Sequence, residues 1–377
     1  MHHCSHPLHL LIQLIRKAIN ANNSIDTDAF CDVEWTPVWK TAIHQGVLGV
    51  TYDAIPRLPA NCRPDTDHLM DWTWQVIESE TKYQKHRQAL TELSDVYSSN
   101  GINMILMKGY GLSLNYPLPH HRPVGDADIY LIHNADTSVV CQKTAGEKGD
   151  EIIRNLDVTV KQNEEKHSVF DYKNLHVENH SDIINEMEHP SLRKLEKFLK
   201  QELKSHSVLD PDTKCYLPSD LFNALFLPLH LGFHFVYGGT ILRQLCDWAM
   251  YVASDKRQID WDKVKELAIE AGYFRFLCCI NGILISVFGV PSRYLPDWPR
   301  EEKLQPRVLD VIIGKNDLVL NSTKDKLKRY FNSRWKYNLV FSKDNYIAAF
   351  FRRMRSFFIW KWGIGGSNIW ARKNLIL

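Results

Sequence analysis

Two aspartates separated by one residue, Asp126 and Asp128, lie between Gly125 and the apolar residues Ile129 and Leu131. Residues two apart in a β-strand point to the same face, so both carboxylates project from a strand that the apolar residues help to bury. Like charges repel unless a cation lies between them, and Mg²⁺ or Mn²⁺ often binds one or two carboxylates together with substrate phosphates. The spacing predicts a metal site. The alternative is a pair of exposed acids on an edge strand.

A lysine–glycine pair, Lys108-Gly109, follows the short apolar run 102–107, which predicts a buried strand that ends in a turn. Glycine lets backbone N–H groups approach a phosphate closely, and a lysine beside it would neutralise triphosphate charge. Arg122, four residues before Asp126, carries a guanidinium that forks phosphate well. These residues predict triphosphate binding. The alternatives are a glycine turn with an exposed lysine, and an arginine solvated in a loop.

A third carboxylate, Glu178, lies in the alternating segment 174–180, which predicts a strand with Glu178 and His180 on one face. Glu178 would act as general base on an attacking hydroxyl or help to hold the metal. Asp171, in the strand predicted over 168–171, competes for this role. A solvated strand face remains the third interpretation.

Two further pairs are spaced by four residues, which places each pair on one face of a helix. His230 and His234 have a spacing that suits zinc, but Leu231 stands where a His-Glu-x-x-His motif needs glutamate, so packing or substrate contact is preferred. Arg243 and Asp247 predict either an intrahelical ion pair or a helical wall that closes over a nucleotide.

Most of the remaining chain has helical periodicity or turn signals. The pattern predicts helices within 7–95, with 72–97 the longest, a short helix at 112–116, a helix over 135–148 that ends near Gly149, and helices from Pro190 to residue 290. It also predicts strands at 126–132 and 155–160.

These motifs resemble the uncharacterised nucleotidyltransferase family of the DNA polymerase beta-type nucleotidyltransferase superfamily. The matching residues are Lys108, Gly109, Tyr116, Pro117, Arg122, Gly125, Asp126 and Asp128, followed by Glu178 as third acid and by His230, His234, Arg243 and Asp247 on helices. The resemblance covers roughly residues 95–255. The chain has Lys108-Gly109 where the wider superfamily commonly has a Gly-Ser turn.

The resemblance implies an α/β fold with a polymerase beta-like core, in which helical regions flank a small mixed sheet. It implies transfer of a nucleoside monophosphate from an NTP to an acceptor hydroxyl or phosphate, with release of pyrophosphate. Asp126, Asp128 and Glu178 would hold Mg²⁺ or Mn²⁺, and Lys108, Gly109, Arg122 and Gly125 would bind the nucleotide. The acceptor stays open among a small molecule, a sugar, a protein and tRNA. The alternatives are a catalytically degenerate nucleotide-binding protein and a membrane- or RNA-associated interaction protein.

Composition sets the wider bounds. The chain has 377 residues, 44% of them hydrophobic and 24% charged, and a net charge of +2. These values are typical of an ordinary globular chain, and no apolar run reaches the roughly 18 residues of a membrane span. We predict a cytoplasmic protein with reduced cysteines and four regions: helices over 1–98, the nucleotidyltransferase core over 99–185, helices over 186–290, and an extension over 291–377.

The end of the chain is basic and aromatic, because it carries six Lys or Arg residues and no acid from Phe350 onward. Such a segment can contact an anionic membrane or a nucleic acid, and its tryptophans can equally cap a core. Contact through 350–377, and with it a peripheral place at a membrane, is therefore an open prediction.

Overall fold

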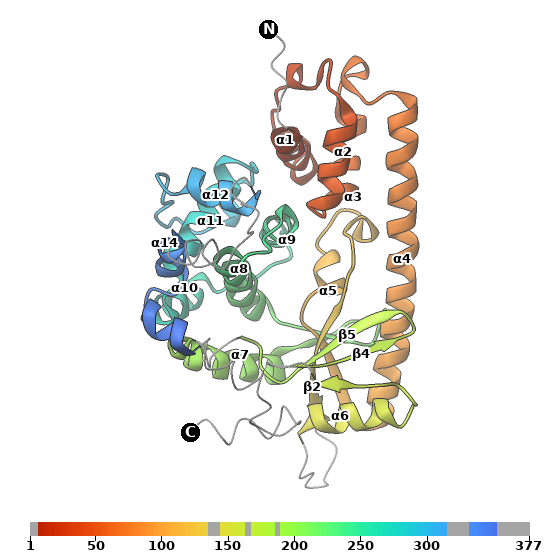
Figure 1. The fold of residues 1–377 in the computed structure, drawn as a ribbon, viewed down its shortest axis with the longest axis vertical. Helices are drawn as coiled ribbons and strands as arrows, with labels where there is room; N and C mark the ends of the chain where they lie inside the picture. Colours follow the sequence, from red (N-terminus) through yellow and green to blue (C-terminus); the bar gives the residue numbers. More distant parts are fainter. Residues whose placement is uncertain (1–6, 135–143, 163–166, 185–188, 315–331, 353–377) are drawn as a thin grey trace. The chain divides into compact units, whose positions relative to one another are not determined.

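A computed structural model describes residues 7–134, 144–162, 167–184, 189–314 and 332–352 (Figure 1). The chain divides into two compact units, each assembled from separate stretches of sequence. The sheet unit comprises residues 84–111, 124–226 and 341–377, and the helical unit comprises residues 1–83, 112–123 and 227–340. The division of the chain into four consecutive regions stays a prediction.

The sheet unit contains a seven-stranded mixed sheet in the order β3-β4-β5-β2-β1-β7-β6. Central β2 pairs with β1 in the antiparallel sense and with β5 in the parallel sense. The strands are β1 (Ile102–Leu106), β2 (Ala127–His133), β3 (Lys161–Gln162), β4 (His167–Tyr172), β5 (Leu175–His180), β6 (Val208–Leu209) and β7 (Tyr216–Leu217).

The two faces of β2 and β5 differ in character. Ile129, Leu131 and Val177 are buried on one face, which helix α6 (Ala145–Arg154) covers. Asn179 on this face donates to Gly146 O at 3.1 Å and to Asp150 Oδ1 at 2.8 Å. Alternation therefore sends the intervening residues of both strands to the opposite face, and a slip of one residue would exchange the faces.

The helices of the sheet unit pack through apolar stripes. Helix α7 (Arg193–His206) follows the 3-10 turn η5 (Pro190–Leu192) and buries Leu195, Leu199 and Leu203 at helical spacing. The long helix α4 (Thr66–Ser99) contributes its residues from 84 onward, and α8 (Asp220–Tyr237) contributes its first turns.

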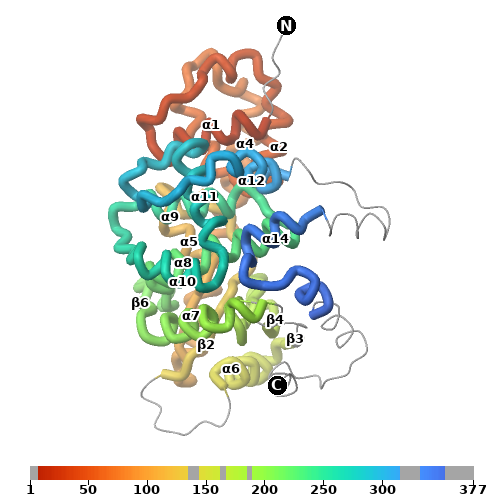
Figure 2. Tube along the Cα trace, turned by 90° about the vertical axis from the view of Figure 1, so that its left-hand side faces the viewer, coloured from red at the N-terminus to blue at the C-terminus, as the bar shows by residue number. Residues whose placement is uncertain are grey.

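The helical unit contains two groups of contacting helices, which can be followed in Figures 1 and 2. The first group is α1 (Pro7–Ile19), α2 (Trp35–His44) and α3 (Leu48–Tyr52). In the second group α11 (Phe274–Ser286) contacts α9 (Leu242–Val252), α10 (Trp261–Ala271), α12 (Gln305–Ile312) and α14 (Arg334–Val340). The unit also contains short 3-10 turns: η1 (Asp28–Phe30), η2 (Ile55–Arg57), η3 (Ala60–Cys62), η4 (Pro119–His121) and η6 (Ser292–Tyr294).

The mixed α/β architecture confirms the predicted fold class at this level, while the polymerase beta-like arrangement stays a prediction. The predicted strands at 102–107, 126–132, 168–171 and 174–180 correspond to β1, β2, β4 and β5. The predicted short helix at 112–116 begins earlier, as α5 (Tyr110–Ser113).

Two predicted elements are wrong. Residues 155–160 form no strand, because Asn155 to Asp157 make a turn in which Asp157 adopts a φ of 60°. The predicted helix end at Gly149 is also wrong, since α6 runs through it to Arg154, while residues 135–143 lie outside the described part. A Cβ at Gly149 would lie 2.1 Å from Leu131 Cδ1, so this glycine permits close packing instead of ending the helix.

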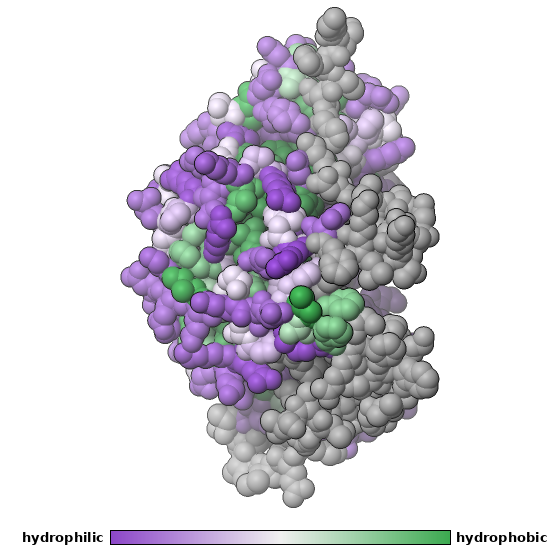
Figure 3. Space-filling view, turned by 60° about the vertical axis from the view of Figure 1, so that its left-hand side comes forward, coloured by the Kyte–Doolittle hydropathy of each residue, from purple (hydrophilic) through white to green (hydrophobic). Residues whose placement is uncertain are grey.

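None of the described helices combines the length and apolar character needed to cross a bilayer. On the face drawn in Figure 3, hydrophilic side chains predominate among the described residues, and hydrophobic ones form small separate patches. Residues 353–377, which include nearly all of the basic aromatic segment, lie outside the described residues.

Candidate metal and nucleotide site

Three carboxylates converge on the face of the sheet opposite α6. Asp126 immediately precedes β2, and Asp128 within β2 stands directly opposite Glu178 of β5 in the parallel register. One oxygen from each of the three side chains lies within 4.8 Å of the other two. The alternation of the two strands thus brings together residues about 50 positions apart in sequence.

Asp128 lies at the centre of the ionic contacts. It is 2% exposed, and its Oδ1 lies 2.8 Å from Lys108 Nζ and 2.9 Å from His180 Nε2. Burial opposes ionisation, but Lys108 and His180 together hold the pKa of Asp128 well below its usual range. Asp128 is therefore a carboxylate whose charge already has cationic partners.

Glu178 shares one of these partners. Its Oε2 lies 3.4 Å from His180 Nε2 and 3.6 Å from His167 Nε2. The contact with His180 lowers the pKa of Glu178, and His167 adds to this effect. Burial would lower the pKa of His180, but its hydrogen bonds to Asp128 and Glu178 raise it. Glu178 is consequently an ionised oxygen donor beside Asp128.

The donor set fits a hard divalent cation. It offers three carboxylates, and Mg²⁺ and Mn²⁺ prefer oxygen ligands. Exposure is graded, because Asp128 is buried, Glu178 is half-buried and Asp126 is exposed. A cation held here would keep one side open for water or phosphate oxygens.

The turn after β1 carries Lys108 into this group. Met107 N–H donates to Asp128 O at 3.0 Å, which extends the pairing of β1 with β2. Gly109 then adopts a φ of +72°, and a Cβ there would lie 3.2 Å from Asp126 O. This position therefore favours glycine on both conformational and steric grounds. At Gly125 a Cβ would meet no atom within 4 Å, so steric crowding does not require a glycine at this position.

Arg122 lies in the helical unit and is bound to Asp247. Its Nε and Nη2 donate to the two oxygens of Asp247 at 2.7 and 2.9 Å, and Tyr116 Oη donates to Oδ1 at 2.7 Å. All three side chains are buried. Burial opposes ionisation of Asp247, but Arg122 lowers its pKa. Within this unit Arg122 therefore ties the segment before β2 to α9, and its predicted phosphate contact stays a prediction.

Comparison with known protein families matches residues 32–289 to the family described as uncharacterised nucleotidyltransferase. This range covers more than half of the chain. The protein belongs to that family. No curated protein and no solved structure matches the chain.

The family match includes every candidate residue named from the sequence and stops before the basic aromatic segment. Asp171, the competing third acid, has a side chain 77% exposed and lies 2.8 Å from His176 Nδ1. It is absent from the carboxylate group around Asp128. Geometry therefore favours Glu178 over Asp171 for a role beside Asp126 and Asp128.

The remaining candidate pairs lie in the helical unit. His230 and His234 face one another with Nε2 atoms 3.2 Å apart. Among the described residues this pair belongs to no group of three metal-ligating side chains. The Asp247 carboxylate accepts hydrogen bonds from Arg122 and Tyr116, and Arg243 also lowers its pKa.

Sequence reasoning missed His167. It stands opposite His180 in the antiparallel pairing of β4 with β5, and the two rings lie 5.0 Å apart. The signal was present, because an antiparallel hairpin over 167–180 places His167 on the face of Glu178 and His180.

Proposed function

We propose that the protein transfers a nucleoside monophosphate from an NTP to an acceptor hydroxyl or phosphate and releases pyrophosphate. The observation that carries this proposal is the convergence of the carboxylates of Asp126, Asp128 and Glu178 beside Lys108. Mg²⁺ or Mn²⁺ would be held by the three carboxylates and would stabilise charge on the triphosphate and on the attacking oxygen. The same proposal includes membership of the protein in the DNA polymerase beta-type nucleotidyltransferase superfamily.

Glu178 is the residue best placed to take a proton. The acceptor oxygen would attack the α-phosphorus, form a new P–O bond and break the bond to the β-phosphate. Glu178 would accept the acceptor's proton, and pyrophosphate would leave with the bond electrons. His180 lowers the pKa of Glu178, which keeps the side chain in the unprotonated form that a general base must have and also makes it a weaker base.

Lys108 would neutralise triphosphate charge. Its side chain is 19% exposed and contacts Asp128, so it would exchange that contact for a phosphate when a metal binds the aspartates. Gly109 would let the backbone approach the phosphates. A cavity of about 650 Å³ lined by Tyr130, His180, Lys200 and Lys204, among others, offers further cationic groups on the sheet unit.

The alternative is a protein that binds nucleotides without catalysis. The observation in its favour is the Lys108–Asp128 ion pair, which satisfies the buried carboxylate without a metal. Metal dependence separates the two. A catalyst needs Mg²⁺ or Mn²⁺ for turnover, whereas a degenerate member binds nucleotide equally well with and without chelator.

The test is incubation of the protein with each labelled NTP and Mg²⁺ in a cell extract, followed by identification of the species that gains label. Label in a product with wild type, and its absence with Asp126→Asn, supports transfer. Label that is equal with the variant, or no labelled product from any NTP, contradicts it. A small molecule, sugar, protein or tRNA acceptor is identified by the labelled fraction.

A further inference from the structure

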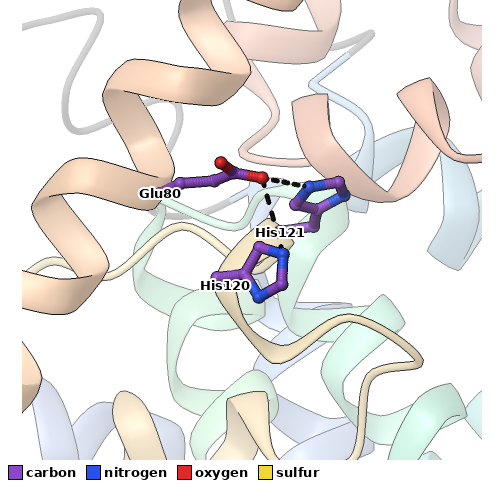
Figure 4. A group of neighbouring side chains, drawn as sticks. All are labelled: Glu80, His120 and His121. Carbon is purple, nitrogen blue, oxygen red and sulfur yellow. Dashed lines mark hydrogen bonds and ion pairs between the residues drawn. The ribbon is translucent and has the colours of Figure 1, made fainter.

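A second group of metal-ligating side chains lies in the helical unit, where Glu80, His120 and His121 point toward one another (Figure 4). Glu80 Oε1 lies 2.7 Å from His121 Nε2 and 3.5 Å from His120 Nε2. One atom from each of the three side chains lies within 4.8 Å of the others. The same carboxylate oxygen is thus shared by two imidazoles.

The backbone holds this group in place. Both histidines end the 3-10 turn η4, and Glu80 projects from α4. Gly49 of α3 packs against the turn so closely that a Cβ there would lie 2.2 Å from His121 O. His121 is 7% exposed, and its backbone packs against α3 at Gly49.

Asp53 orients the buried imidazole. Its Oδ1 lies 2.7 Å from His121 Nδ1. When Nδ1 carries a proton and donates it to Asp53, the lone pair of Nε2 faces Glu80 and His120. A carboxylate behind a histidine in this manner is the arrangement that fixes tautomer and ring orientation in zinc sites.

We propose that His120 Nε2, His121 Nε2 and Glu80 Oε1 bind a divalent cation of the zinc class, with Asp53 as a positioning residue. Two ligands of a tetrahedral zinc ion, each about 2.0 Å from it, lie roughly 3.3 Å apart. The observed 2.7 and 3.5 Å lie on either side of this separation, and all three donor atoms lie within 4.8 Å of one another, so modest side-chain rotations would bring them to ligand distance from one ion. Imidazole ligands favour zinc over Mg²⁺, and three protein ligands leave a position for water.

A purely ionic explanation centres on His121, with His120 at a longer distance from the same carboxylate. Burial lowers the pKa of His121, but hydrogen bonds to Asp53 and Glu80 outweigh it and raise the pKa, so an imidazolium could join the two carboxylates. In that explanation His120, whose side chain is 34% exposed and 3.5 Å from Glu80, is only a second and longer ion-pair partner, whereas a metal would make it a ligand. His120 therefore distinguishes metal binding from an ion pair.

The experiment uses the full chain, without an affinity tag, in which His2, His3, Cys4 and His6 are replaced by alanine to remove adventitious ligands. After dialysis against EDTA, ZnCl₂ is titrated by calorimetry and CoCl₂ by visible absorption. Binding with tetrahedral cobalt bands is expected in this background. His120→Ala should weaken zinc by more than about 100-fold, and Asp53→Asn by about 10–100-fold.

Two variants make the assignment specific. His120→Cys should restore zinc binding and add thiolate-to-cobalt absorption, because cysteine is itself a zinc ligand. His68→Ala removes a histidine of α4 that also lies beside a carboxylate but outside the proposed site, and it should leave zinc affinity unchanged. Circular dichroism of each variant reports on folding.

His167, Glu178 and His180 of the sheet unit form another possible zinc group, so His167→Ala is titrated in parallel. Zinc lost with His120→Ala and regained with His120→Cys supports the proposal. The proposal is overturned if the background binds no zinc, if folded His120→Ala binds it equally, or if all zinc is lost only with His167→Ala.

Discussion

Replacing Asp126 or Asp128 by asparagine separates metal binding from folding. Both substitutions remove a carboxylate from the candidate metal site, but their surroundings differ. Asp128 is 2% exposed and lies 2.8 Å from Lys108 Nζ, whereas Asp126 is exposed. We expect both variants to lose Mg²⁺-dependent nucleotide binding, and only Asp128→Asn to lose stability without metal.

The magnitude follows from burial. Removing one partner of a fully buried ion pair costs about 3–5 kcal/mol, because the other charge is left without compensation. The Lys108 side chain is 19% exposed and keeps some hydration, so we reduce the expectation to about 2–3 kcal/mol. At about 2–4 °C per kcal/mol for a unit of 150–250 residues, Tm should fall by roughly 4–12 °C. Asp126→Asn should stay within about 0.5 kcal/mol of wild type.

Repulsion between Asp126 and Asp128, considered alone, would give the opposite expectation, because removing one of two like charges relieves that repulsion. The structure provides the reason why a loss of stability is expected instead. Asp128 lies next to Lys108 and His180, so its removal breaks attractive contacts in addition to relieving repulsion from Asp126.

The assay is thermal unfolding in EDTA, in Mg²⁺ alone, and in Mg²⁺ with ATP or another NTP. Ligand at 100 times its Kd should stabilise wild type by about 2.7 kcal/mol, and neither variant should show this gain. Full nucleotide-dependent stabilisation of Asp126→Asn would refute the metal site. Wild-type stability of Asp128→Asn in EDTA would refute the argument from the buried ion pair.

Three other outcomes follow from the contacts. Glu178→Gln should keep NTP binding but lose transfer in single-turnover assays, while Asp171→Asn should keep both; the opposite pattern would reassign the base. Lys108→Ala should weaken NTP binding roughly ten- to a hundredfold and NMP binding less, and Lys108→Arg should restore NTP binding in part. Equal NTP affinity of wild type and Lys108→Ala in titrations would show that the lysine does not bind the triphosphate. Breaking the Arg122–Asp247 pair with Asp247→Asn should lower Tm. The pKa of Asp247 in the folded protein lies below its ordinary value of 3.8. The ion pair therefore stabilises the fold fully above pH 3.8, and this stabilisation is lost as the pH falls through the lower folded-state pKa. The Tm difference between wild type and Asp247→Asn should persist at pH 7 and vanish in strong acid.

The sequence by itself determined the local elements and the face of the sheet that carries charge. Alternation placed Asp128 and Glu178 opposite the apolar residues, because the side chains of a strand point to the two faces in turn. Alternation also predicted β2 and β5, and the short apolar run before Lys108-Gly109 predicted β1. Where a residue's environment came from a distant segment, local pattern failed, as at Gly149, whose role depends on Leu131 of β2.

Only the tertiary structure decided which charged side chains meet. Local spacing placed Arg243 and Asp247 on one helix face, and folding within the helical unit adds Arg122, 125 positions away, to the same carboxylate. In the same unit Glu80 meets His121 from 41 positions away. The packing of apolar surfaces determines which distant polar side chains become neighbours, because the hydrophobic effect that drives this packing is non-directional. Periodicity along a chain records which face a residue occupies, and the packing of separate elements decides what that face touches.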